Sequence, residues 1–176
     1  MSATAALATA YPSLTRGRSP HPALAGCEDV AWSAVPGCPK DVPVVLRGLL
    51  DPDAAEQAES VLGWILLSGP MAISAATPAF VPFLLRLAAD PSVPRRGELF
   101  GLVLVVAALS EPSDPGNAWS LALSGAEQDH PERRLCRASF AADAALVLGL
   151  LADEELSAAS SLSEDDRTSL LRAAGL

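Results

Sequence analysis

The 176-residue chain has few of the residues that catalysis, metal binding and disulfide formation require. It contains three cysteines and two histidines, and no two cysteines have the CxxC spacing of a metal or redox site. We therefore expect no metal ion and no cofactor, and we expect a reduced, cytoplasmic protein. Aromatic residues make up only 5% of the chain, whereas alanine and leucine number 33 and 28. Since both are strong helix formers, the composition predicts an all-α fold.

Lysine is almost absent, because Lys40 is the single lysine among 12 cationic residues, against which stand 21 acidic ones. The formal net charge of −9 gives an acidic surface that repels phosphate groups, so nucleic acids and anionic membranes are not expected partners. The preference for arginine over lysine, with the high alanine content, is typical of a high-GC bacterial genome. The first 20 residues have neither the basic start nor the continuous apolar stretch of a secretory signal, which again favours the cytoplasm.

Long apolar runs suited to a membrane are also missing. Residues 60–85 carry no charge, but Pro70, Pro78 and Pro82 would leave backbone groups unpaired in lipid. Residues 99–109 would reach only about 16 Å as a helix, half of the ~30 Å core of a bilayer. Both segments are therefore expected to be buried helices.

Composition divides the chain into two parts. Residues 1–26 are rich in alanine, serine, threonine and proline, and we expect a flexible N-terminal arm that adds little to the core. Residues 27–176 are expected to form a single helical-repeat domain.

Capping residues and turns predict where the helices lie in that domain. Asp41 and Asp53 are the expected N-caps of two helices, and Ser68-Gly69-Pro70 ends the second. Thr77 is the expected cap of a helix that ends at Ala89. The other predicted helices cover residues 28–35, 99–109, 114–123, 131–151 and 163–174, the last with a capping box of Ser163 and Asp166.

An internal repeat follows from two matching hexapeptides, VPVVLR at residues 42–47 and VPFLLR at residues 81–86. Each ends four residues before an Asp-Pro pair, and the offset between them is 39 residues. A period of this length with two helices per unit predicts a short α-solenoid of stacked antiparallel helix pairs, of HEAT size and without a sheet. The expected core contains Leu46, Leu49, Val61, Leu62, Ile65, Phe83, Leu84, Leu102, Val103, Val106 and Leu146.

These motifs resemble those of bacterial HEAT-repeat-like proteins over residues 30–110. The features that carry the resemblance are Ala31-Trp32-Ser33, Asp41-Val42-Pro43 with Leu46-Arg47, Gly69, and Ala76-Thr77 with the VPFLLRL run at residues 81–87. The resemblance implies an α-solenoid that binds other macromolecules. Some similar proteins look like immunity partners that neutralise bacterial toxins, which makes a protein inhibitor one expected form of the function. No third unit matches after residue 111.

The charged residues that begin the second helix of each unit are the expected partner-binding surface. In stacked repeats one helix of each pair lines a shared face, so these side chains would gather there. A purely solvated row of charges is the alternative. The residues are Glu56, Glu59, Arg95, Arg96, Glu98, Arg133, Arg134 and Arg137.

Three further residues have two interpretations each. Arg47 and Arg86 occupy equivalent repeat positions, where they form either a ladder for an acidic partner or ties to carboxylates of their own or adjacent units. Trp64 lies off the apolar stripe of its helix, and packing between units is favoured over a role as an interface anchor.

No catalytic constellation is evident, so the leading expectation is a non-enzymatic protein-interaction module. The alternative is a small-molecule enzyme or ligand carrier with a pocket between helices near Asp143 and Cys136. Cys136 follows His130 by six residues, a poor spacing for a thiol–imidazole pair, and a small core residue is the favoured interpretation. Asp143 is expected either to accept a hydrogen bond or to face solvent.

Overall fold

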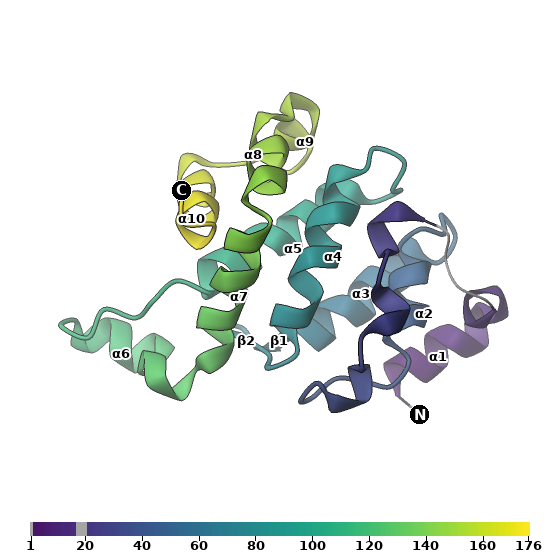
Figure 1. Cartoon of the computed structure of the whole chain (residues 1–176), viewed down its shortest axis with the longest axis horizontal. Helices are drawn as coiled ribbons and strands as arrows, with labels where there is room; N and C mark the ends of the chain where they lie inside the picture. The colour runs from purple at the N-terminus through teal and green to yellow at the C-terminus, as the bar shows by residue number, and fades with distance from the viewer. Residues whose placement is uncertain (1, 17–20) are drawn as a thin grey trace.

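The structure is a computed structural model of the whole chain, and it describes residues 2–16 and 21–176 (Figure 1). In these residues the regular structure is helical apart from one short hairpin, which confirms the all-α class. The α-helices are α1 Ala3–Ala10, α2 Val42–Gly48, α3 Ala55–Leu66, α4 Thr77–Ala89, α5 Arg96–Leu109, α6 Ala118–Ser124, α7 Pro131–Ala142, α8 Ala144–Ala152, α9 Glu154–Ala159 and α10 Glu164–Ala173.

The N-terminal segment belongs to the core, so the expectation of an arm outside it is wrong for the described residues. Leu7 of α1 is completely buried, and Leu14 and Leu24 are buried from two 3₁₀ turns. The helix α1 packs against α2, and the turn that contains Leu24 packs against α4. These leucines are too widely spaced to form a continuous stripe. Leu7 and Leu14 both lie against Gly48 of α2, whereas the turn of Leu24 lies on α4. Residues 1 and 17–20 of the predicted arm lie outside the described residues.

Trp32 joins the next segment to the core. The predicted helix at residues 28–35 consists of two 3₁₀ turns, Cys27–Asp29 and Trp32–Ala34. The buried indole packs against Phe80 and Phe83, with ring centroids 4.9 and 5.8 Å apart, and donates a hydrogen bond to the Cys27 carbonyl at 2.8 Å. The tryptophan thus fixes this segment to α4 through both its ring and its N–H.

The helices α2 and α3 form the first predicted pair. Asp41 is the N-cap of α2 as predicted, but its side chain accepts no capping hydrogen bond. The N-cap of α3 is Ala54 and not the predicted Asp53. Asp51 instead accepts from the Asp53 backbone at 2.9 Å, which closes the turn between the helices.

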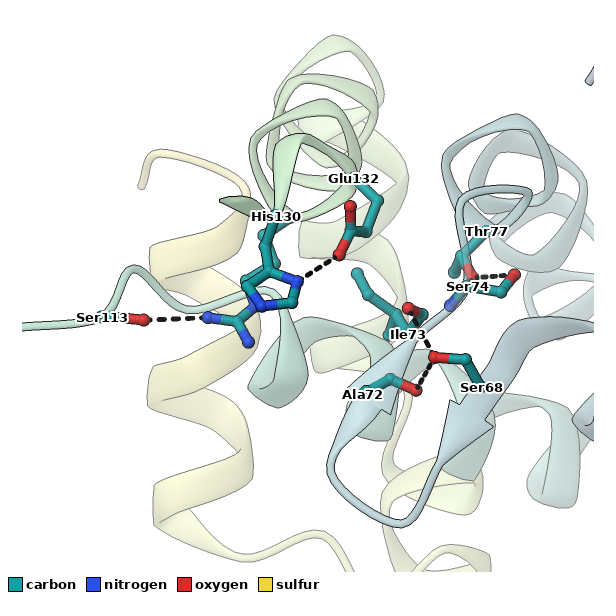
Figure 2. A network of polar contacts seen from close by, with 9 residues as sticks. Ser68, Ala72, Ile73, Ser74, Thr77, Ser113, His130 and Glu132 are labelled. Atoms are coloured by element: carbon teal, nitrogen blue, oxygen red, sulfur yellow. Dashed lines mark hydrogen bonds and ion pairs between the residues drawn. The ribbon is translucent and has the colours of Figure 1, made fainter. Parts of the chain in front are cut away.

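A hairpin follows α3, and it corrects the prediction that the fold has no sheet. Strands β1 Leu67–Gly69 and β2 Ala72–Ile73 pair antiparallel. In Figure 2 the Ser68 hydroxyl reaches the carbonyls of Ala72 and Ile73, at 3.3 and 3.2 Å. The Thr77 hydroxyl donates to the Leu66 carbonyl at 2.7 Å, so Thr77 satisfies the end of α3 although Ala76 is the N-cap of α4.

The second predicted pair, α4 and α5, lies at the centre of the molecule. The helix α4 ends at Ala89 as predicted and begins one residue earlier than predicted, and it packs against α5 on one side and α7 on another. The helix α5 also contacts α3 and α10. A third layer, α7 with α10, therefore covers the central pair on the side away from α2 and α3 (Figure 1).

The third unit differs from its prediction. The expected helix over residues 131–151 is broken at Asp143 into α7 and α8, whose axes are bent by 74°. The short helix α6 is present, but in Figure 1 it projects at the end of the molecule opposite α1 instead of pairing with α7. The helix α7 packs chiefly on α4 and also contacts α10, which begins with the predicted capping box of Ser163 and Asp166.

The predicted core residues are buried with three exceptions. Ile65, Leu102 and Leu146 are partly exposed at the edge of the core. Phe80, Phe100 and Phe140 are completely buried large side chains of α4, α5 and α7. One apolar cluster therefore runs from the N-terminal segment to α10.

Candidate functional site

A cluster of charges lies where α3 and α5 begin, as expected for two of the second helices. The Arg95 Nε donates to the Glu59 carboxylate at 2.6 Å, and its Nη2 lies 3.2 Å from Glu98. The bond to Glu59, with the added field of Glu98 and Glu56, raises the pKa of Arg95 above its ordinary value. Glu56 and Glu98 are exposed, whereas Arg95 and Glu59 are partly covered. Four of the predicted site residues therefore form one group.

Arg96 turns away from this group. Its side chain forms an ion pair with Asp153, the N-cap of α9, and only 15% of the side chain is exposed. The pKa of Asp153 is lowered by the hydrogen bond from the Leu156 backbone and by the bond from Arg96. Arg96 thus fixes α9 to the start of α5 and is a positioning residue for the fold, not part of the exposed cluster.

The three arginines of α7 do not form the expected single surface. Arg133 is only 4% exposed, and its guanidinium donates to the Ser113 hydroxyl at 2.9 Å (Figure 2). Arg137 donates to the Ser110 carbonyl and pairs with Glu127. Both arginines hold the segment between α5 and α7, and only Arg134 is exposed.

Exposed apolar side chains lie farther along both helices, beyond the charge cluster. Trp64 is 82% exposed, so the expectation that it packs between units is wrong. Val105 of α5 is 41% exposed, and Leu102 is partly exposed one turn earlier. We call the exposed side of α3 and α5 the outer face, and it comprises Glu56, Glu59, Ser60, Gly63, Trp64, Arg95, Glu98, Gly101, Leu102, Val105 and Ala108.

The two helices of the outer face run in the same direction. Their starts are joined by Glu59 and Arg95. At the other end, strand β2, which follows α3, contacts α5, and Met71 of the hairpin shares a cavity wall with Ala108 and Leu109. The outer face therefore has a charged end, where both helices begin, and an apolar end, where both finish.

The apolar part of this face was missed from the sequence, although one signal was present. Trp64 follows Ser60 by four positions and Glu56 by eight, so all three occupy one row of the helix. A tryptophan in an otherwise polar row of a helix indicates that its side chain faces the solvent. Val105 gave no such signal, because α5 is apolar around most of its circumference.

A shallow cavity of about 390 Å³ lies beside Trp64. Its wall includes Val61 and Ile65 of α3, Thr4 of α1 and Pro39, and the side chains that line it carry no charge. The indole of Trp64 stands on the rim of this cavity. Such a hollow suits an apolar side chain of a partner better than a charged one.

The residues of the alternative enzyme hypothesis do not form a reactive pair. Cys136 is completely buried, and burial raises the pKa of its thiol to about 12, so the thiolate is scarce at neutral pH. The His130 ring is hydrogen-bonded to Glu132, whose Oε1 lies 2.9 Å from the His130 Nδ1 (Figure 2). Asp143 lies in the break between α7 and α8, half-buried. This arrangement does not favour nucleophilic catalysis by Cys136.

Two wider properties concern metals and membranes. In residues 2–16 and 21–176 no group of three or more metal-ligating side chains is assembled. Across the same residues no single helix is long and apolar enough to span a membrane, and one pair, α7 with α8, qualifies by length and composition only with a 74° bend.

Comparisons of the chain with protein-family models, curated proteins and solved structures gave no match. The function proposed for the chain therefore rests on its own geometry.

Proposed function

We propose that the chain is a non-enzymatic protein-interaction module, built as a short HEAT-like α-solenoid, and that it binds its partner through the outer face. The observation that supports this proposal most strongly is the exposure of Trp64 and Val105 on the two helices whose starts carry a charge cluster with an excess of carboxylates. Aromatic residues that stand exposed near the centre of a surface are typical anchors of protein interfaces.

The solenoid part of the proposal is supported by the 39-residue offset, which relates α2 to α4 and α3 to α5. The pairs α2–α3 and α4–α5 pack internally, and α3 contacts α5. Second helices of successive units thus lie side by side, as they do on the binding surfaces of stacked repeats.

The negative net charge of the chain favours a partner protein with a positive net charge. A chain of charge −9 repels nucleic acid and attracts basic proteins over distances of about a Debye length, ~8–10 Å at physiological salt. An inhibitor of a basic toxin is one form of this function, and cytoplasmic location stays a prediction that accompanies it.

The test is affinity capture from a lysate of the native host, with quantitative mass spectrometry. Val105→Asp places a charge on the outer face, and Leu148→Asp is the matched control because Leu148 is equally apolar and exposed on α8. Partners that bind the outer face are lost with Val105→Asp and kept with Leu148→Asp. Equal recovery of every protein by both variants would contradict the proposed face.

A further inference from the structure

Two glycines of the outer face are not packed against any residue that the structure describes. Among residues 2–16 and 21–176, a Cβ added at Gly63 or Gly101 would meet no atom within 4 Å, whereas one at Gly48 would come within 2.8 Å of the Ala58 Cβ. Glycine inside a helix costs roughly 0.5–1 kcal/mol relative to alanine, so Gly63 and Gly101 weaken α3 and α5 without any internal gain. At these two positions no side chain covers the helix backbone, so another chain could approach the backbones of α3 and α5 closely.

Larger apolar side chains lie next to these glycines. Leu102 and Val105 expose apolar surface on α5, and the exposed Trp64 follows Gly63 on α3. The helix α3 has 12 residues, and its length of about 18 Å gives room for roughly three turns of a partner helix. Helices that pack through small residues approach to about 8 Å between axes.

The charged end of the outer face is negative. Glu56, Glu59 and Glu98 surround one cation, Arg95. The positive ends of the α3 and α5 dipoles, worth roughly half a charge each, do not cancel the excess of carboxylates. A cationic side chain of the partner would therefore be stabilised at this end and nowhere else along the apolar part of the face.

We infer that the outer face receives an amphipathic α-helix of a partner protein, with its apolar stripe over Gly63, Leu102 and Val105 and a lysine or arginine beside Glu56 and Glu98. The inference rests on the proposed function. An extended segment would need backbone hydrogen bonds from the surface, but the backbones of α3 and α5 are already paired within their helices. A helical ligand satisfies its own backbone and needs only apolar contact and one charge.

The test is a selection of helical peptides of about 16 residues, displayed as a library, against the wild-type protein and against two variants. Gly63→Leu fills the low surface, and Gly149→Leu is its matched control, because a Cβ at Gly149 in α8 also meets nothing. Leucine is the better helix former, so neither change weakens its helix. Trp64→Ala is paired in the same way with Trp119→Ala, since Trp119 of α6 is 73% exposed.

The inference predicts enriched peptides with apolar residues spaced i, i+3, i+4 and i+7 and a lysine or arginine at one end. Their affinity falls about tenfold or more with Gly63→Leu and Trp64→Ala and changes less than about twofold with the controls. Substitution of Glu56 and Glu98 by glutamine, or a rise in salt from about 0.05 to about 0.3 M, weakens the same peptides.

Three results would overturn the inference. These are no enrichment over a parallel selection on the Gly63→Leu protein, equal binding to both glycine variants, and enriched peptides without cationic residues. If capture from lysate still depends on Val105 in any of these cases, the interaction-module proposal stands and only the helical, basic nature of the partner is wrong.

Discussion

Arg47 and Arg86, which lie 39 residues apart at equivalent positions of α2 and α4, both bind carbonyl groups of the N-terminal segment. The Arg47 Nε donates to the Leu14 carbonyl at 2.6 Å, and an Nη of Arg86 donates to the Ala25 carbonyl at 2.9 Å. Arg47 also pairs with Glu28, while Arg86 stacks over the Phe83 ring at 4.7 Å. The repeated arginine therefore anchors one segment to two successive units. Of the two interpretations, a tie to a carboxylate holds for Arg47, which pairs with Glu28, whereas the polar partner of Arg86 is a backbone carbonyl and the two side chains form no ladder.

The first prediction concerns this N-terminal segment. Leu7→Ala removes a fully buried side chain, and we expect the free energy of unfolding to fall by about 2–5 kcal/mol. Leu148→Ala is the control, because Leu148 is half-exposed and its loss should cost less than about 1 kcal/mol. Urea denaturation followed by circular dichroism measures both. Equal losses for the two variants would mean that α1 is not part of the cooperative core.

The second prediction separates glycines that pack from those that do not. Gly63→Ala and Gly101→Ala should each raise the free energy of unfolding by roughly 0.5–1 kcal/mol, because the added methyl group meets nothing and α3 and α5 gain helix propensity. Gly48→Ala should lower it by about 1–3 kcal/mol, because its Cβ would clash with Ala58. Thermal and urea denaturation of the three variants give the signs. A loss of stability with Gly63→Ala would show that its position is packed.

The third prediction follows from the thiol of Cys136. Its pKa is raised to about 12 in the folded chain, against an ordinary value of 9.0, so the unfolded chain loses this proton first. The thiol's contribution to stability is complete below pH 9.0 and is lost between that pH and the folded pKa, with a slope of up to about 1.4 kcal/mol per pH unit. The stability advantage of the wild type over Cys136→Ala should therefore shrink from about pH 8 to about pH 10.5 in urea titrations. A constant difference would place Cys136 in a solvated site.

The fourth prediction concerns Asp153, whose pKa is lowered by the Leu156 backbone N–H and by Arg96. A lowered carboxyl pKa stabilises the fold above its ordinary value of 3.8, and this stability is lost as pH falls through the folded pKa. Asp153→Asn keeps an oxygen for capping α9 but removes the charge, so its thermal midpoint should lie below the wild type at neutral pH.

The same pair of proteins should converge as the pH falls through the lowered pKa of Asp153 and the wild-type carboxylate becomes protonated. Glu155→Gln is the control, because Glu155 is an exposed carboxylate in the first turn of the same helix. A deficit of Asp153→Asn that persists unchanged at low pH would indicate a steric cause instead of the ion pair with Arg96.

Much of the fold could be predicted because capping residues and prolines mark the ends of several helices. The bounds of α4 follow from Thr77-Pro78 and Asp90-Pro91, and the capping box at Ser163 fixes the start of α10. The break at Asp143 could not be predicted, because neither glycine nor proline interrupts the apolar pattern there. Leu7 was missed because isolated leucines among alanines carry no periodicity, and their burial depends on helices that come later in the chain.

The candidate site was predicted only in part, because sequence spacing gives the position of a residue on its helix but not its burial in the tertiary structure. Sequence spacing placed Glu59 and Arg95 at the starts of equivalent helices, and the two side chains do meet. The same spacing does not reveal which arginines turn inward, because the burial of Arg133 depends on Ser113 in a distant loop. The exposure of Val105 depends on α10 covering only part of α5, which is a property of the tertiary packing.

Site-specific photo-crosslinking in cells of the native host tests directly whether the outer face binds a partner protein. A photoreactive amino acid replaces Val105 on the outer face or Leu148 on α8, both exposed apolar positions. We expect a discrete protein adduct at Val105 and none at Leu148, and we expect the Val105 adduct to be lost on Glu56→Lys and Glu98→Lys. An adduct at Leu148 without one at Val105, equal adducts at both, or none at either would contradict the outer face as the binding surface.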